Sequence, residues 1–177
     1  MVENKVHAGL KYSPPKIRTV LVALDYEPSA QHVAETGYTV ASALGASLVL
    51  MHVVADNVYY STPEYSPVMG FTGFSSTDIT GQVGMADLKV ASQDYLNITK
   101  HHLGDDNIQT MVIEGDTPQS IIDAAIAVDA GMVVLGSHNR RGLDRMLMGS
   151  TAEDVLRKIT IPLLVVPTRG KDNDGAL

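Results

Sequence analysis

The residues best suited to chemistry in this 177-residue chain follow its fourth apolar run and surround two glycines. The turn Gly136-Ser137-His138-Asn139 comes directly after that run, and Gly149-Ser150 lies ten residues beyond Asn139. Glycine lets a ligand approach the backbone closely, and Asn is one of the few other residues that tolerate a positive φ. Arginines between the glycines would complement the charge of a phosphate; they are Arg140, Arg141 and Arg145. The pattern indicates an anion site, with an ordinary turn and a solvated basic face as the alternative.

Ser150 lies at the predicted start of the last helix, where free N–H groups and the helix dipole attract phosphate. The sequence Ser150-Thr151-Ala152-Glu153 matches a capping box, in which the Ser150 hydroxyl caps the helix. Phosphate binding by the same hydroxyl is the alternative, because both roles need the same N–H groups. The sequence leaves the choice open, and the two roles could alternate with ligand occupancy.

Short apolar runs alternate with amphipathic segments and would position these residues. The runs predict strands at residues 20–24, 48–54, 108–113, 132–135 and 161–166. Helical spacing marks residues 30–44, 88–98, 121–128 and 152–159, and Asp116 and Pro118 form a cap and first turn for the third helix. This alternation predicts an α/β fold with an open parallel sheet and right-handed crossovers.

Ligands of open α/β sheets bind at the carboxyl ends of the strands, where the strand order reverses. Asp25 follows the first predicted strand, and Gly136 follows the fourth. If these two strands are neighbours, Asp25 and Gly136 face one crevice.

Composition argues against several other functions. The net charge is −7, Trp is absent and aromatic residues are sparse, so we expect no nucleic-acid binding. The chain has no cysteine, which excludes disulfides and cysteine-based metal sites. The apolar runs are too short to span a membrane, and no signal peptide is evident, so we expect a cytoplasmic protein without membrane insertion.

Three further motifs are weak candidates for chemistry. His101-His102 would form a poor metal chelate, because adjacent histidines on a helix point to different faces, and a solvated helix end is the preferred interpretation. Ser137-His138 lacks the glycines of a nucleophile elbow. No Gly-rich sequence ends in Gly-Lys-Ser or Gly-Lys-Thr, so a P-loop ATPase is not expected.

The domain organisation follows from the same pattern. We expect an N-terminal extension at residues 1–16, one domain at residues 17–168 and a C-terminal tail at residues 169–177. A segment at about residues 55–81 is rich in Ser, Thr, Gly, Pro and Tyr and interrupts the alternation. It is interpreted as a mobile insertion, with a lid or a partner surface as the alternative.

On these residues the chain resembles the universal stress protein family, in its UspA-like, ATP-binding subgroup. The resemblance covers residues 17–168 apart from the insertion. Its most specific part is the spacing of Gly136, Asn139, Gly149 and Ser150, which is similar to the family's signature of Gly, two residues, Gly, nine residues, Gly, then Ser or Thr. Asn139 stands where that signature has its second glycine. Asp25 resembles the family's nucleotide-contacting aspartate.

The resemblance implies a five-stranded parallel sheet of order 3-2-1-4-5 with helices on both faces, the adenine nucleotide alpha-hydrolase-like fold. It implies that ATP or AMP binds at the carboxyl ends of the strands, accompanied by Mg²⁺ held mainly by phosphate oxygens. The implied nucleotide-binding residues are Ala23, Asp25, Val53, Leu135, Gly136, Asn139, Gly149, Ser150, Thr151 and Ala152. It also implies a homodimer formed through the last strand, which begins at Ile161 and ends at Val166.

The resulting hypothesis is a stress or regulatory protein in which ATP acts mainly as a ligand. The nucleotide would order the glycine turn and the insertion, and so control conformation or the binding of an unidentified regulatory protein. A slow ATPase or autophosphorylating enzyme is one alternative, for which His138 and Asp144 are the nearby candidates for a base. A dimeric interaction module that has lost nucleotide binding is the other, and Asn139 is the residue that favours it.

Overall fold

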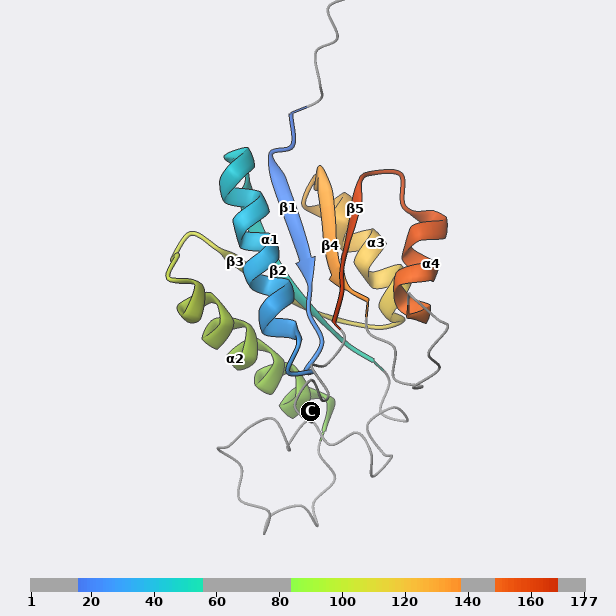
Figure 1. Cartoon of the computed structure of the whole chain (residues 1–177). Helices are drawn as coiled ribbons and strands as arrows, with labels where there is room; N and C mark the ends of the chain where they lie inside the picture. The colour runs from blue at the N-terminus through green and yellow to red at the C-terminus, as the bar shows by residue number, and fades with distance from the viewer. Residues whose placement is uncertain (1–15, 56–83, 138–148, 169–177) are drawn as a thin grey trace, which may run out of the picture.

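The five apolar runs form one parallel sheet in the computed structural model, which describes residues 16–55, 84–137 and 149–168 (Figure 1). The strands are β1 (Thr19–Ala23), β2 (Ser47–Val54), β3 (Gln109–Glu114), β4 (Met132–Gly136) and β5 (Leu163–Val166). They lie in the order β3-β2-β1-β4-β5, and every neighbouring pair is parallel. The predicted fold class is confirmed, together with the strand order that the resemblance implied.

Four helices connect successive strands: α1 (Ala30–Leu44), α2 (Met85–Leu103), α3 (Thr117–Ala127) and α4 (Ser150–Lys158). Helices α1 and α2 cover one face of the sheet, and α3 and α4 cover the other (Figure 1). The core is therefore divided into two layers by the sheet. Within the described residues, no helix combines the length and the hydropathy needed to span a bilayer.

Successive residues of each strand point into opposite layers, as the pleat of a strand requires. In β1, Val20 and Val22 pack in the layer of α1 and α2, whereas Leu21 packs in the layer of α3 and α4. In β2, Leu50 packs in the first layer and Met51 in the second. Both faces are apolar because both are covered, and this explains the unbroken apolar runs in the sequence.

Helix α1 lies unusually close to the sheet at Gly37. A Cβ atom at this position would lie 2.4 Å from Cγ2 of Val22, whose side chain is fully buried in β1. The absence of a side chain at Gly37 lets the helix pack directly on the strand that leads to Asp25.

The predicted start of the third helix is confirmed. Asp116 is the N-cap of α3, its side chain accepts a hydrogen bond from the backbone N–H of Gln119 at 3.1 Å, and Pro118 lies in the first turn. The side chain thereby satisfies one of the N–H groups that the first turn leaves without an intrahelical partner.

The predicted capping box of the last helix is wrong. The N-cap of α4 is Gly149, in an extended conformation with φ −74° and ψ 159°, and Ser150 is already the first helical residue. The backbone N–H of Glu153 donates to the carbonyl oxygen of Gly149 at 3.0 Å. The helix begins one residue earlier than Ser150 would dictate, because Gly is also an accepted N-cap and an extra helical residue adds a backbone hydrogen bond.

The last strand is shorter than predicted, because it starts at Leu163 and not at Ile161. Pro162 lies just before the strand, and its carbonyl oxygen accepts a hydrogen bond from the N–H of Val133 at 3.0 Å. A proline has no N–H to offer a neighbouring strand, so this position closes the ladder with its carbonyl alone.

Candidate functional site

The crevice predicted between Asp25 and Gly136 lies at the carboxyl edge of the sheet. Strands β1 and β4 are neighbours, and Ala23 pairs with Leu135 in their last rung. A small cavity of about 20 Å³, close to the volume that one water molecule requires, is lined there by Ala23, Asp25, Gly136 and Thr168. The strand order reverses at this point, since β1 and β4 are not consecutive in the chain. This is the place where open α/β sheets bind ligands.

The carboxyl ends of β4 and β5 are joined at this edge by Ser137. Its N–H donates to the carbonyl oxygen of Val166 at 2.8 Å, and its Oγ accepts from the N–H of Thr168 at 3.1 Å. Ser137 therefore holds two strand ends together, a structural role that the sequence did not reveal.

The turn after β1 presents the side chain of Asp25. Its Oδ1 accepts a hydrogen bond from the backbone N–H of Glu27 at 3.1 Å, and the residue is half-buried. An aspartate that bonds the backbone two residues ahead forms an Asx turn, which fixes the direction of the chain after the strand. The second carboxylate oxygen of Asp25 carries the remaining capacity for a ligand.

Val53 lies one strand away from Asp25 and beyond the last rung between β1 and β2. That rung pairs Ala23 with Met51, whose carbonyl oxygen accepts from the N–H of Leu24 at 2.9 Å. Val53 is two residues further on, so its backbone faces the same side as that of Met51. Its side chain is buried in the layer of α3 and α4. Only the backbone of Val53 is thus directed towards the end of β1.

The N-terminus of α4 supplies the other part of the predicted site. The helix begins at the carboxyl edge of the sheet (Figure 1), and Ala152 is buried in the same cluster as Leu135. Gly149 caps the helix without a side chain, Ser150 is exposed and Thr151 is half-buried. Burial of Ala152 fixes the helix, and the first-turn N–H groups point out of its N-terminus along the helix axis at this edge of the sheet.

Several predicted residues lie outside the described residues. Asn139 is among them, as are the three arginines of the glycine turn and the two candidates for a base. The proposed insertion is also outside, apart from Ala55, and so are both terminal segments beyond residues 16 and 168.

Three aromatic side chains form a cluster beside Asp25, and the sequence did not single them out. The ring centroids of Tyr26 and His52 are 4.3 Å apart, those of Tyr26 and Tyr95 are 5.1 Å apart, and those of His52 and Tyr95 are 6.3 Å apart. The Tyr26 hydroxyl also lies 2.6 Å from Oγ of Ser92 in α2. One signal was visible in the sequence: His52 is the only polar side chain within the apolar run of β2 after Ser47.

Burial determines the protonation of this cluster. His52 is only 5% exposed, and burial lowers the pKa of its ring against the smaller opposing effects of the Leu24 carbonyl and of Asp25. The ring is therefore neutral at pH 7. Burial, together with the charge of Asp25, raises the pKa of Tyr95 far above its usual value, so its hydroxyl remains a hydrogen-bond donor.

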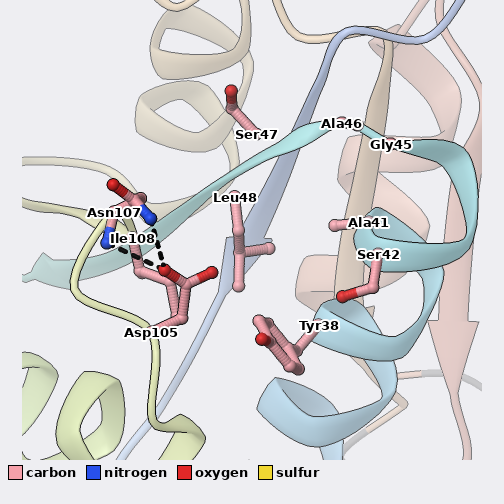
Figure 2. Close-up of a pocket in the computed structure, with 10 residues that line it drawn as sticks. All are labelled: Tyr38, Ala41, Ser42, Gly45, Ala46, Ser47, Leu48, Asp105, Asn107 and Ile108. Carbon is pink, nitrogen blue, oxygen red and sulfur yellow. Dashed lines mark hydrogen bonds between the residues drawn. The ribbon is translucent and has the colours of Figure 1, made fainter.

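A larger cavity, of about 230 Å³, lies at the opposite end of the sheet (Figure 2). Tyr38 from α1 and the turn before β3 border it, and Oδ1 of Asp105 in that turn accepts hydrogen bonds from the N–H and the Nδ2 of Asn107 at 2.9 and 3.0 Å. None of the predicted nucleotide-binding residues lines this cavity. It is a feature of the amino ends of the strands and separate from the crevice at Asp25.

His101 and His102 lie exposed in the last turn of α2, as expected for a solvated helix end. Nε2 of His102 is 2.9 Å from Oε1 of Glu35, so this residue connects α2 to α1. Among the described residues, no group of three or more histidine, aspartate or glutamate side chains is placed to hold a metal ion.

The arrangement of sheet and helices is that of an open α/β domain with five parallel strands and a crevice at the carboxyl edge. Residues 16–167 match the universal stress protein family, and the chain belongs to that family. The universal stress protein E homolog of Haemophilus influenzae is 30% identical over 149 residues, which cover 81% of this chain and 43% of that protein. Universal stress protein MJ0531 of Methanocaldococcus jannaschii is 24% identical over 157 residues, which cover 88% of this chain and 85% of its own length. The chain thus spans less than half of the Haemophilus relative.

Solved structures of the family share the fold. UspA from Lactobacillus plantarum has a TM-score of 0.63 at 21% identity, over 86% of this chain and 99% of its own. A universal stress protein in complex with cAMP has a TM-score of 0.56 at 20% identity, over 88% and 100%. The universal stress protein from Archaeoglobus fulgidus in complex with dAMP has a TM-score of 0.54 at 17% identity, over 85% and 98%.

Proposed function

We propose that the chain binds ATP at the carboxyl edge of its sheet and that the nucleotide acts as a regulatory ligand. The observation that carries this proposal is the convergence of three features at one edge: Asp25 after β1, Gly136 at the end of β4, and the start of α4, which Gly149 caps without a side chain. Two structures of the same fold, described in complex with cAMP and dAMP, support an adenine nucleotide as the ligand class.

The proposed pose follows the chemistry of each part. The ribose lies against Ala23 and the free carboxylate oxygen of Asp25, which accepts hydrogen bonds from its hydroxyls. Adenine meets the backbone of Val53, because backbone N–H and C=O groups can read its polar edge. The phosphates lie between Gly136, Asn139 and the start of α4, where Ser150, Thr151 and Ala152 offer N–H groups and the helix dipole favours negative charge.

Mg²⁺ accompanies the phosphates in this proposal. The ion usually keeps several waters and binds through phosphate oxygens with few protein ligands, so a preformed carboxylate cluster is unnecessary. ATP should therefore bind more tightly in the presence of Mg²⁺ than in its absence, whereas the affinity for AMP should depend less on the ion.

The proposal is tested by identifying what the purified chain carries and what it binds. Mass spectrometry of the supernatant after denaturation should detect an adenine nucleotide, and titration calorimetry of the nucleotide-free protein should give saturable ATP binding. Asp25→Ala is the variant that removes the carboxylate, and it should lower the affinity for ATP. Absence of binding to ATP, ADP and AMP by folded protein would refute the proposal. Release of ADP during incubation would instead favour the slow ATPase.

We also propose that the protein is a homodimer formed through its last strand, over residues 161–166. β5 is an edge of the sheet, so one row of its backbone N–H and C=O groups faces away from β4. Leu163, Leu164 and Val165 are half-buried in the single chain. An apolar edge strand of this kind favours pairing with another strand.

A further inference from the structure

The hydrogen-bond ladder between β1 and β2 is replaced by side-chain contacts where it reaches the proposed nucleotide site. Its last backbone bond runs from the N–H of Leu24 to the carbonyl oxygen of Met51 at 2.9 Å. Beyond this bond, the carbonyl oxygens of Leu24 and Asp25 accept hydrogen bonds from side chains, one from β2 and one from α2. The position of the Asp25 turn therefore depends on those side chains.

The first of these contacts is made by His52 of β2. Its Nδ1 lies 2.7 Å from the carbonyl oxygen of Leu24, and since a carbonyl only accepts, Nδ1 carries the proton and donates it. Its Nε2 is buried and has no hydrogen-bond partner among the described residues. An apolar side chain would avoid that unfavourable burial. The contact that His52 provides, and that an apolar residue would lack, is the bond to Leu24.

The second contact is made by Tyr95 of α2. Its hydroxyl donates to the carbonyl oxygen of Asp25 at 2.8 Å. The ring of Tyr26 packs against the rings of both His52 and Tyr95, at centroid distances of 4.3 and 5.1 Å. The Tyr26 hydroxyl in turn bonds Ser92, whose Oγ donates to the carbonyl oxygen of Leu88 at 2.7 Å. The residues on both sides of the Asp25 carboxylate are thus attached to β2 and to α2.

We propose that His52 and Tyr95 are positioning residues of the nucleotide site, which act on ligand affinity by holding the backbone that presents the Asp25 carboxylate. The inference rests on the proposed function, because it assumes that Asp25 contacts the nucleotide. Neither side chain needs to touch the ligand. His52 fixes the carbonyl before Asp25 and Tyr95 fixes the carbonyl of Asp25 itself, so the loss of either contact lets the carboxylate move away from the ribose.

The experiment is a double-mutant cycle on ATP affinity, measured with the full chain by calorimetry. Tyr95→Phe removes only the hydroxyl and should weaken ATP binding roughly three- to tenfold, the usual effect of one net hydrogen bond. In the Asp25→Ala background the same substitution should change the affinity by less than about twofold, because the group it positions is gone. A merely structural role of Tyr95 would lower the affinity equally in both backgrounds.

His52 is tested with a matched pair of variants. His52→Leu removes the donor at similar volume and should weaken ATP binding roughly three- to tenfold. His52→Asn places an amide nitrogen where Nδ1 lies, and it should recover most of that affinity. Tyr38→Phe is the control, since Tyr38 lies at the far end of the sheet (Figure 2) and should leave the affinity unchanged. Thermal unfolding of each variant establishes that it is folded at the temperature of the titration.

Every outcome of these titrations either supports or overturns the positioning roles of His52 and Tyr95. Equal losses with and without Asp25, no loss in Tyr95→Phe, or no recovery in His52→Asn would overturn the positioning roles. Failure of the wild-type chain to bind any adenine nucleotide would overturn the proposed function as well. Normal wild-type binding with unaffected variants would overturn only the positioning inference, so the two failures are distinguishable.

Discussion

Replacing Gly149 with Asp should stabilise the fold and, at the same time, weaken nucleotide binding. Gly149 is the N-cap of α4 and has φ −74° and ψ 159°, an ordinary extended conformation that Asp and Asn adopt readily. In Gly149→Asp the new carboxylate would accept hydrogen bonds from the N–H groups of Thr151 or Ala152. These are the donors that the proposed function assigns to the phosphates, so the cap and the ligand would compete for them.

The two effects differ in size. Exchange of Gly for Asp at an N-cap is worth a few tenths of a kcal/mol, and a negative charge at a helix N-terminus adds about 0.3–1 kcal/mol. Glu153, in the first turn of α4, opposes this slightly by repulsion. We expect a net gain of about 0.5 kcal/mol in the free energy of unfolding. A carboxylate about 5 Å from a phosphate charge costs about 3 kcal/mol at an effective dielectric constant of about 20, which corresponds to a loss on the order of 100-fold in affinity.

A series of three variants separates charge from capping. Gly149→Asn would cap the helix without a charge and should weaken ATP binding on the order of tenfold. Gly149→Ala neither caps the helix nor adds a charge, so it should bind ATP like the wild type. Calorimetry gives the affinities, and urea unfolding of the nucleotide-free protein gives the stabilities. The difference between the Asp and Asn variants should shrink as salt is raised. A Gly149→Asp protein that is stabilised and yet binds ATP within about threefold of the wild type would refute phosphate binding at this helix.

Three other perturbations test the remaining arguments. Successive residues of β5 direct their backbone N–H and C=O groups to opposite sides, so those of Leu164 face β4 and those of Val165 face away from it. Val165→Pro should therefore yield folded monomers in sedimentation analysis, whereas Leu164→Pro should lower the melting temperature. A dimeric Val165→Pro protein would count against pairing through β5. Gly37→Ala should destabilise the fold by about 1 kcal/mol in urea unfolding, since overpacking of about 1–3 kcal/mol against Val22 exceeds a helix-propensity gain of about 1 kcal/mol. The double variant with Val22→Ala should lose less stability than the sum of the two single losses, because the smaller side chain removes the clash. Additive losses would contradict the clash. Burial lowers the pKa of His52 below its ordinary value of 6.5, so the unfolded chain takes up a proton that the folded chain excludes as the pH falls below about 6.5. The free energy of unfolding should therefore decline there by up to about 1.4 kcal/mol per pH unit. His52→Asn should remove that share of the decline measured between pH 8 and 5, and an unchanged slope would contradict a buried neutral ring.

The fold was predictable because its signals are local and repeated. Each strand of the sheet is an apolar run and each connection has helical spacing, so the alternation alone predicts a parallel sheet. The order of the strands was a different matter. It came from the resemblance carried by Gly136, Gly149 and Ser150, because pairing between strands depends on contacts that no single segment specifies.

The boundaries of elements were less predictable, for identifiable reasons. The sequence around Ser150 fits two helix starts that differ by one residue, and both Gly149 and Ser150 are acceptable caps. The choice between them depends on the packing of the whole helix, in which Ala152 is buried against the sheet. The predicted last strand has Pro162 at its start, whereas the observed strand begins at Leu163.

The residues that surround Asp25 could not be inferred from spacing. Tyr95 is 70 positions away from Asp25 in the chain, and Ser92 is 66 positions from Tyr26. Each looks like an ordinary member of an amphipathic helix, and their meeting depends on how α2 crosses the sheet. His52 does carry a signal in the sequence, since a histidine within an apolar run indicates a buried polar contact.

The two ends of the proposed site depend on opposite layers of the core, and this gives a physical route from ligand to conformation. Asp25 is held by His52 and Tyr95, which lie in the layer of α1 and α2. The start of α4 is held by Ala152, which is buried in the layer of α3 and α4. A nucleotide that contacts both ends would bind most tightly when the distance between Asp25 and the start of α4 matches the length of the nucleotide. Because a ligand shifts an equilibrium only by its difference in affinity between the states, such a bridge would make the relation of the two layers, and no single loop, the quantity that the nucleotide controls.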